Sequence, residues 1–105
     1  VDDESLCRAV NLIIRHHGGI ALTDGGDEKI LPLPVAGIMS NADGWEVASR
    51  YKDLDQLAKD LGSHLRSPFM TLSFIALPVI PKLKLTDKGL FDGECYTFTS
   101  LFDSL

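Results

Sequence analysis

The sequence has few of the side chains that metal sites and disulfide frameworks require. It holds two cysteines and three histidines in 105 residues. Cys7 and Cys95 lack CxxC spacing, so we expect reduced thiols in a cytoplasmic protein. His16 and His17 are adjacent and would point about 100° apart on a helix. His64 is far from both in the sequence, so the chain has neither a His-x-His pair nor two histidines four residues apart on a helix. No metal-ligand pattern is therefore present.

A surplus of basic charge and a long hydrophobic run are also missing. The formal net charge is −5, whereas a nucleic-acid or anionic-membrane surface needs a basic patch. The longest apolar run, Phe69 to Ile80, is too short to span a bilayer and contains Pro78. The acidic opening, Asp2 to Glu4, is the opposite of a signal-peptide start. We therefore expect a cytoplasmic protein with no nucleic-acid or membrane partner.

No group of reactive side chains has the spacing of a catalytic site. The acidic cluster around Gly25 and Gly26 lacks the alternating ligands of a calcium loop and the spacing of a phosphate loop, and a hairpin turn explains it. Ser67 has no His-Asp partners and is better explained as a helix cap. Cys95 lacks a nearby base, which predicts an inert, buried or half-buried thiol. We expect no catalytic, cofactor-binding or metal residue, and an inactive isolated chain.

Apolar residues are abundant. They make up 45% of the chain, enough for one folded domain spanning residues 1–105 without disulfides or metal. The mean hydropathy of +0.09 is high for a small domain. Part of the apolar surface is therefore expected to face a partner rather than a core.

The first half of the chain predicts a helix and a hairpin. Asp3 or Ser5 can cap the helix, and Gly18 can end it. Strands are expected at Ile20–Thr23 and Lys29–Leu33, around the Asp-Gly-Gly-Asp turn. The expected core face of the helix has a spacing of 3.6 residues and consists of Leu6, Ala9, Val10, Ile13 and Ile14. Val35 to Met39 is a short apolar segment that is a candidate for a further strand.

The second half predicts two more helices and several strands. One helix runs from Gly44 to Leu61, capped by Asn41 or Asp43. Its apolar stripe consists of Val47, Tyr51, Leu54, Leu57, Ala58 and Leu61. Pro68 to Leu77 is interpreted as a short buried helix, with a strand as the alternative. Strands are expected at Leu83–Thr86, Leu90–Phe91 and Tyr96–Leu101. These elements predict an α+β fold, with a mainly antiparallel sheet and two to three flanking helices.

The short helix carries the candidate contact residues, because apolar side chains occur on nearly all of its faces. They are Phe69, Met70, Leu72, Phe74, Ile75 and Leu77. They can form a core, line a ligand pocket or make an interdomain contact.

Several long strings of the sequence resemble one enzyme family. They include LPLPVAGIMS at 31–40, SPFMTLSF at 67–74, LPVIP at 77–81 and LKLTDKGL at 83–90. In this order they resemble the C-terminal domain of bacterial-type adenine deaminase, in the amidohydrolase superfamily. The resemblance runs from about Val10 to Phe91, and the tail after Asp92 departs from it most.

The resemblance implies a parent enzyme that hydrolyses adenine to hypoxanthine and ammonia. Its divalent metal (iron, manganese or zinc) would sit in a β/α barrel whose ligands begin with His-x-His, and this chain has neither. The implied partner is the catalytic amidohydrolase barrel of the same polypeptide. The implied role is to dock on and brace the barrel, or to support a homo-oligomer. The alternatives are an assembly module and a free-standing nucleobase-binding module, with Ser40, Asn41, Thr71 and Ser73 as candidate polar groups.

Overall fold

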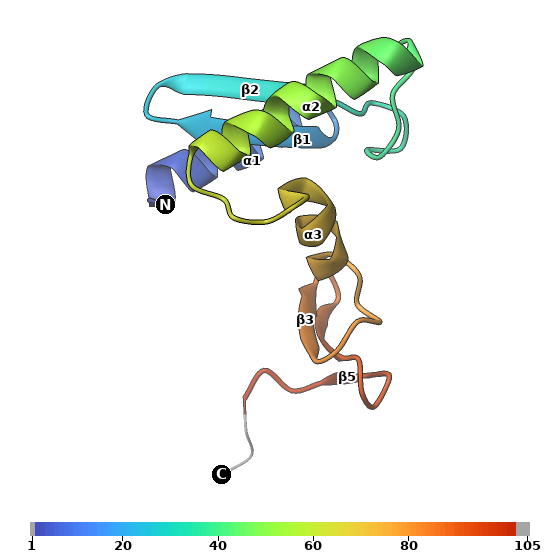
Figure 1. The fold of residues 1–105 in the computed structure, drawn as a ribbon. Helices are drawn as coiled ribbons and strands as arrows, with labels where there is room; N and C mark the ends of the chain where they lie inside the picture. The colour runs from blue at the N-terminus through green and yellow to red at the C-terminus, as the bar shows by residue number, and fades with distance from the viewer. Residues whose placement is uncertain (1, 103–105) are drawn as a thin grey trace. The chain divides into compact units, whose positions relative to one another are not determined.

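The computed structural model describes residues 2–102, and the chain divides into two compact units, Val1–Leu65 and Arg66–Leu105. The first unit holds α1, β1, β2 and α2, and the second holds α3, β3, β4 and β5 (Figure 1). Three helices and two antiparallel sheets confirm the α+β prediction. None of the helices in the described range is both long enough and apolar enough to cross a membrane. The assignment of all 105 residues to one domain stays a prediction.

Helix α1 spans Asp3–Arg15, and both of its ends differ from the prediction. Asp2 is the N-cap, because its carboxylate accepts the amide of Ser5 at 2.7 Å. At the other end His16 is the C-cap, and the positive φ values begin at His17, with 58°, one residue before Gly18. The caps are thus shifted by one or more residues because local hydrogen bonds select among neighbouring candidates.

Strands β1, Gly19–Asp24, and β2, Asp27–Pro32, form the expected antiparallel hairpin around Gly25 and Gly26. The strand β2 ends at Pro32, in line with the absence of a donor there. Helix α1 packs mainly on β1 and α2 packs on β2. This arrangement confirms the sequence interpretation of residues 19–32.

Val35 to Met39 forms a turn closed by a single β-bridge instead of a strand. Ala36 and Gly37 have φ values of 56° and 78°, so the chain reverses too tightly to extend. The turn lies against the backbone of Gly18. A Cβ added to Gly18 would come within 2.3 Å of the Gly37 Cα, so the contact requires glycine.

Helix α2 spans Gly44–Asp60, as predicted to within one residue. The Asp43 carboxylate accepts the amide of Trp45 at 3.0 Å, which settles the choice of cap. Leu54 is buried, whereas Leu61 at the end of the expected stripe is half exposed. The central part of the stripe therefore faces the hairpin side of the unit.

The second unit contains α3, Pro68–Ile75, and a three-stranded sheet. Its strands are β3, Leu83–Thr86, β4, Gly89–Asp92, and β5, Thr97–Thr99, in the order β3-β4-β5. The ring of Phe91 on β4 makes edge contacts with Tyr96 and Phe98 at centroid distances of 5.5 and 5.4 Å. The helical interpretation of residues 68–75 is confirmed over a strand.

The core within residues 2–102 is small. Three large apolar side chains are buried, Leu12, Leu31 and Leu54. The expected core face of α1 is wrong: Leu6 is 57% exposed and Ile14 is 65% exposed. The buried side of α1 carries Leu12 instead. Burial of α3 is also not seen, since only Pro68 is buried there.

Candidate functional site

The histidines do not converge on a metal site. His16 is the C-cap of α1, His17 follows it, and His64 lies exposed beyond α2. Within residues 2–102 no three His, Cys, Asp or Glu side chains lie close enough together to hold an ion. The metal that the family resemblance implies therefore does not fit any residue set described in this chain.

The surroundings of Cys95 do not activate its thiol as a nucleophile. It is exposed, which corrects the prediction of a buried or half-buried thiol. The Asp92 carboxylate accepts the amides of Glu94 and Cys95 at 2.8 and 3.0 Å. The negative charge of Asp92 raises the pKa of the Cys95 thiol, which disfavours the nucleophilic thiolate. The Cys95 thiol is therefore accessible but less easily ionised than an isolated thiol.

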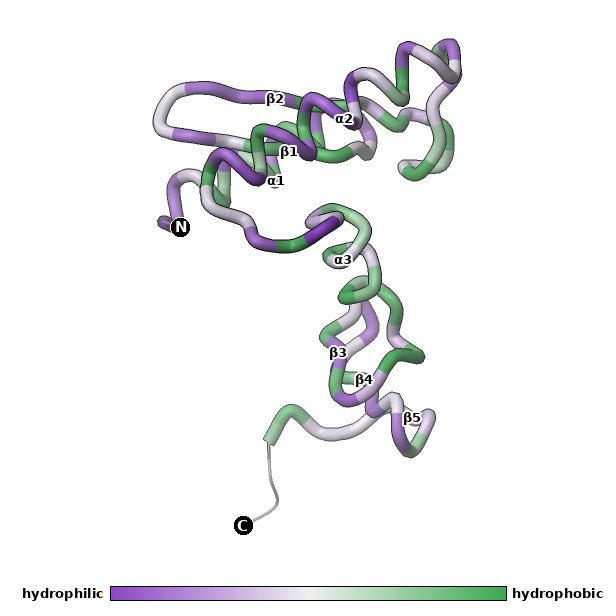
Figure 2. Tube along the Cα trace, viewed as in Figure 1, coloured by the Kyte–Doolittle hydropathy of each residue, from purple (hydrophilic) through white to green (hydrophobic). Residues whose placement is uncertain are grey.

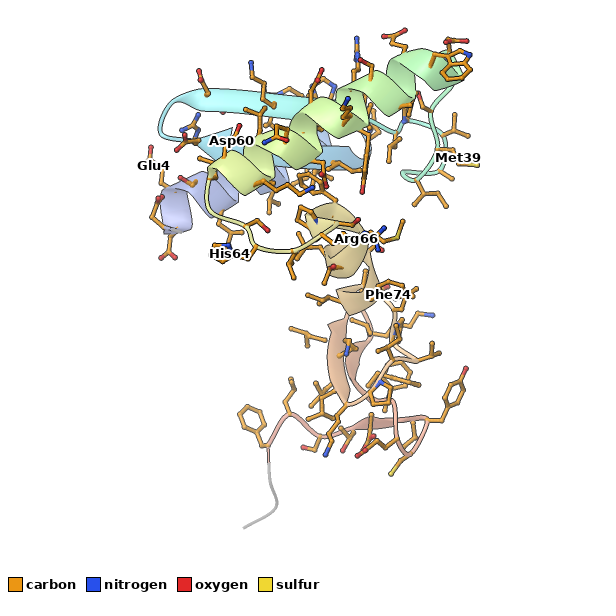
Figure 3. All side chains as sticks on the ribbon, viewed as in Figure 1. Glu4, Met39, Asp60, His64, Arg66 and Phe74 are labelled. Carbon is orange, nitrogen blue, oxygen red and sulfur yellow. The ribbon has the colours of Figure 1, made fainter. Side chains whose placement is uncertain are left out.

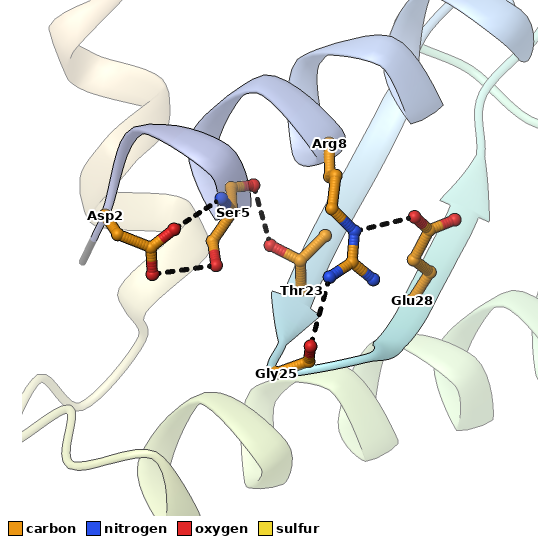
Figure 4. Close-up of polar contacts among 6 residues, drawn as sticks. All are labelled: Asp2, Ser5, Arg8, Thr23, Gly25 and Glu28. Carbon is orange, nitrogen blue, oxygen red and sulfur yellow. Dashed lines mark hydrogen bonds and ion pairs between the residues drawn. The ribbon is translucent and has the colours of Figure 1, made fainter.

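A cavity of about 640 Å³ is an open hollow lined by the start of α1 and the hairpin turn. Several of the polar groups there bond to one another (Figure 4). The hydroxyl of Thr23 donates to the carbonyl of Ser5 at 2.9 Å, and Arg8 pairs with Glu28 at 3.1 Å. The amide of Ser5 lowers the pKa of Asp2, which favours the ionised cap. These contacts attach α1 to the hairpin.

The candidate nucleobase-binding side chains belong to two different units. Ser40 and Asn41 line a cavity of about 180 Å³ beside β2 and α2, below the roughly 300 Å³ where ligand pockets begin. Thr71 and Ser73 lie on α3 in the other unit, and their hydroxyls donate to the carbonyls of Ser67 and Met70. Ser40 and Asn41 therefore line one cavity, whereas the hydroxyls of Thr71 and Ser73 are hydrogen-bonded to nearby backbone carbonyls.

The prominent feature of the described chain is its exposed apolar surface. Within residues 2–102, 22 large apolar side chains are exposed, and green apolar segments recur along both units in Figure 2. Helix α3 and the residues after it contribute Met70, Leu72, Phe74, Ile75 and Leu77, while Phe69 is half-buried. Phe74 is labelled on α3 in Figure 3. The structure thus brings the six candidate contact residues together on one short helix and its end.

Sequence reasoning missed two apolar surfaces besides α3. One is formed by the turn before α2, which exposes Ile38 and Met39, and by Trp45 at the start of α2, which is 86% exposed. The other is the apolar side of α1, whose 3.6-residue spacing was recognised but was expected to face the core. Periodicity shows that a helix has an apolar side, but it does not show which neighbour covers that side.

The chain spans less than a fifth of the length of the curated relatives that it resembles. It is 53% identical over 97 residues to "Adenine deaminase" of Sulfurovum sp. (strain NBC37-1), covering 91% of this chain and 18% of the relative. It is 50% identical over 101 residues to "Adenine deaminase" of Archaeoglobus fulgidus, covering 96% of this chain and 18% of that relative. No solved structure matches.

A match to a family model covers nearly the whole chain. The family is described as the adenine deaminase C-terminal domain, and the match spans residues 1–96. This range includes the first unit, most of the second, and the strings on which the sequence resemblance rests. The chain therefore belongs to the family of adenine deaminase C-terminal domains.

Proposed function

We propose that this chain is a non-catalytic domain of an adenine deaminase and that it docks through α3 on the catalytic region of the same polypeptide. The whole enzyme would hydrolyse adenine to hypoxanthine and ammonia with a divalent metal held outside this chain. The observation that carries the docking role is the exposed apolar surface centred on α3. Soluble monomers rarely expose large contiguous apolar patches without a binding partner.

The composition of α3 supports burial against a partner. Its sequence, PFMTLSFI, has apolar side chains all round the helix. A helix of this kind is typical of a buried position in a larger protein. Transfer of each exposed side chain such as Leu72 or Ile75 out of water stabilises the docked state by about 1.5–3 kcal/mol. The described part of this chain supplies no cover for them.

The polar atoms of α3 are also suited to an apolar environment. Thr71 Oγ1 donates to the carbonyl of Ser67 at 2.9 Å, and Ser73 Oγ donates to that of Met70 at 2.7 Å. An unpaired hydroxyl would cost about 1–3 kcal/mol on burial. Because both hydroxyls already have partners within the helix, α3 can enter an apolar surface without that cost.

A thiol-protection experiment tests the docking role. The protein is a Sulfurovum deaminase in which this chain replaces its matching segment, with Cys7 and Cys95 changed to serine. Met70→Cys is compared with Ser49→Cys, a control on the exposed side of α2. We expect iodoacetamide to modify Met70→Cys at least about 50-fold more slowly, because burial blocks access to the thiolate.

Equal rates at the two positions, with Leu72→Cys also reacting freely, would contradict docking through α3. Assembly is tested separately by light scattering on the same chimaera with and without residues 66–102. A change in subunit number on this deletion, together with protection of Met70→Cys in the undeleted chimaera, would assign residues 66–102 a role in oligomerisation as well.

A further inference from the structure

We infer that, in a full-length deaminase, a β-strand from the rest of the polypeptide pairs with the outer edge of β1. The inference rests on the proposed function only in taking the rest of the deaminase polypeptide as the partner. It concerns the first unit, whereas the docking role concerns α3.

The hairpin is an incomplete sheet in the described part of the chain. Strand β1 pairs with β2 alone, and no other strand within residues 2–102 lies on its outer edge. A two-stranded hairpin is marginally stable in water, and an unpaired edge presents a row of donors and acceptors to another strand. The sheet can therefore accept a further strand.

The register identifies which backbone groups face outward. The amide of Leu33 donates to the carbonyl of Gly18 at 3.1 Å, so residues 18 and 33 face each other across the hairpin. Backbone groups of successive residues alternate between the two edges of a strand, so in the register of the hairpin residues 20, 22 and 24 also face inward and residues 19, 21 and 23 face outward. The amides of Ala21 and Thr23 therefore point to the outer edge of β1.

The two edges of the hairpin differ in their capacity for pairing. By the same alternation, position 32 of β2 faces outward, and Pro32 has no N–H to donate. Strand β1 contains no proline, and its residues 20–22 are aliphatic. The outer edge of β1 is thus the edge that offers an uninterrupted ladder.

The apolar side of α1, which consists of Leu6, Val10, Ile13 and Ile14, points away from the hairpin. The side that packs on the hairpin carries the buried Leu12 and Ser5, whose carbonyl accepts from Thr23 on β1. At about 100° per residue, Val10 lies about 160° round the helix from Leu12, and Ile14 lies about 180° from Ser5. The apolar side therefore lies too far round the helix to cover a strand beside β1.

The open edge defines the occupant as an extended segment. A strand beside β1 would accept hydrogen bonds from the outward amides of Ala21 and Thr23. More than four-fifths of each deaminase relative lies outside the matched segment, which leaves ample polypeptide for such a strand. A second copy of this chain is disfavoured as the occupant, because each copy has a net charge of −5.

Hydrogen exchange in the Sulfurovum chimaera tests this inference. Fragmentation that resolves single residues would report Ala21 and Thr23, with Glu28 and Ile30 on the outer edge of β2 as internal controls. We expect exchange at Ala21 and Thr23 to be at least about 100-fold slower than at the controls. Equal exchange at both edges, or protection on the β2 edge alone, would overturn the inference.

The outcome is independent of docking through α3. Unprotected Ala21 and Thr23 alongside a protected Met70→Cys would remove the added strand and leave the proposed function standing. The reverse result would leave the added strand and remove docking through α3. Protection of Ala21 that appears in the 105-residue chain only as its concentration rises would identify a second copy as the occupant and overturn the inference.

Discussion

Substitution of Gly18 by alanine is expected to be among the most damaging single-methyl changes in the first unit. Gly18 has φ 122°, which L side chains rarely adopt, and its backbone abuts the turn at Gly37. An alanine Cβ would lie 2.3 Å from the Gly37 Cα, 2.6 Å from its carbonyl oxygen and 2.8 Å from its carbonyl carbon. The overlap is with backbone, so rotation of a side chain cannot relieve it.

The expected cost follows from two contributions. Backbone strain at a positive φ costs about 1–3 kcal/mol, and forcing extra atoms into a packed contact costs about 1–3 kcal/mol more. Gly25→Ala is the matched control, since Gly25 also has a positive φ, 55°, but has no atom within 4 Å of the added Cβ. Gly18→Ala should therefore destabilise the chain by about 2 kcal/mol more than Gly25→Ala.

Urea unfolding followed by circular dichroism measures this difference on the 105-residue chain. At an m value of about 1–3 kcal/mol per molar, 2 kcal/mol corresponds to a midpoint lower by about 0.7–2 M. If the two variants unfold within about 0.5 kcal/mol of each other, the close contact between residues 18 and 37 does not contribute to stability and the reasoning fails.

Three further predictions concern caps and charges. Asp43→Ala should lower the free energy of unfolding by about 1 kcal/mol in urea, because it removes the α2 cap, whereas Asp53→Ala in mid-helix should change it little. The Ser5 amide lowers the pKa of Asp2 from 3.8. The contribution of Asp2 to the stability of the folded chain is therefore present above the unfolded pKa and is lost as pH falls through the folded pKa. Asp2→Asn should reduce this loss of stability in acid, measured by unfolding at a series of pH values. Asp92→Asn should speed alkylation of Cys95 near pH 8, measured by mass spectrometry, and an unchanged rate would show that Asp92 does not control the thiol.

Local patterns predicted most elements of the fold. The Asp-Gly-Gly-Asp turn located the hairpin, and Asp43 with the apolar stripe located α2 to within one residue. The strand at Leu83–Thr86 was placed without error. These features depend on interactions between residues close in sequence, such as caps, turns and alternation, so the sequence carries them directly.

The failures concern what covers each surface. Leu6 and Ile14 were expected in the core because they share a helical side, yet the helix packs through Leu12 and polar contacts of Arg8. Likewise, the apolar side chains of α3 did not show whether this helix forms a core, lines a ligand pocket or makes an interdomain contact. A periodic pattern records that a side chain prefers to leave water, and it carries no information on which distant segment it meets.

The sequence by itself determined the family, the order of helices and strands, and the absence of a His-x-His ligand pair, because each is written in short-range strings. Only the tertiary structure decided that α1 turns its apolar side away from β2, that the outer edge of β1 is open, and that Gly18 abuts Gly37. Those features arise where segments far apart along the chain come together, and the backbone geometry of that meeting has no local signature.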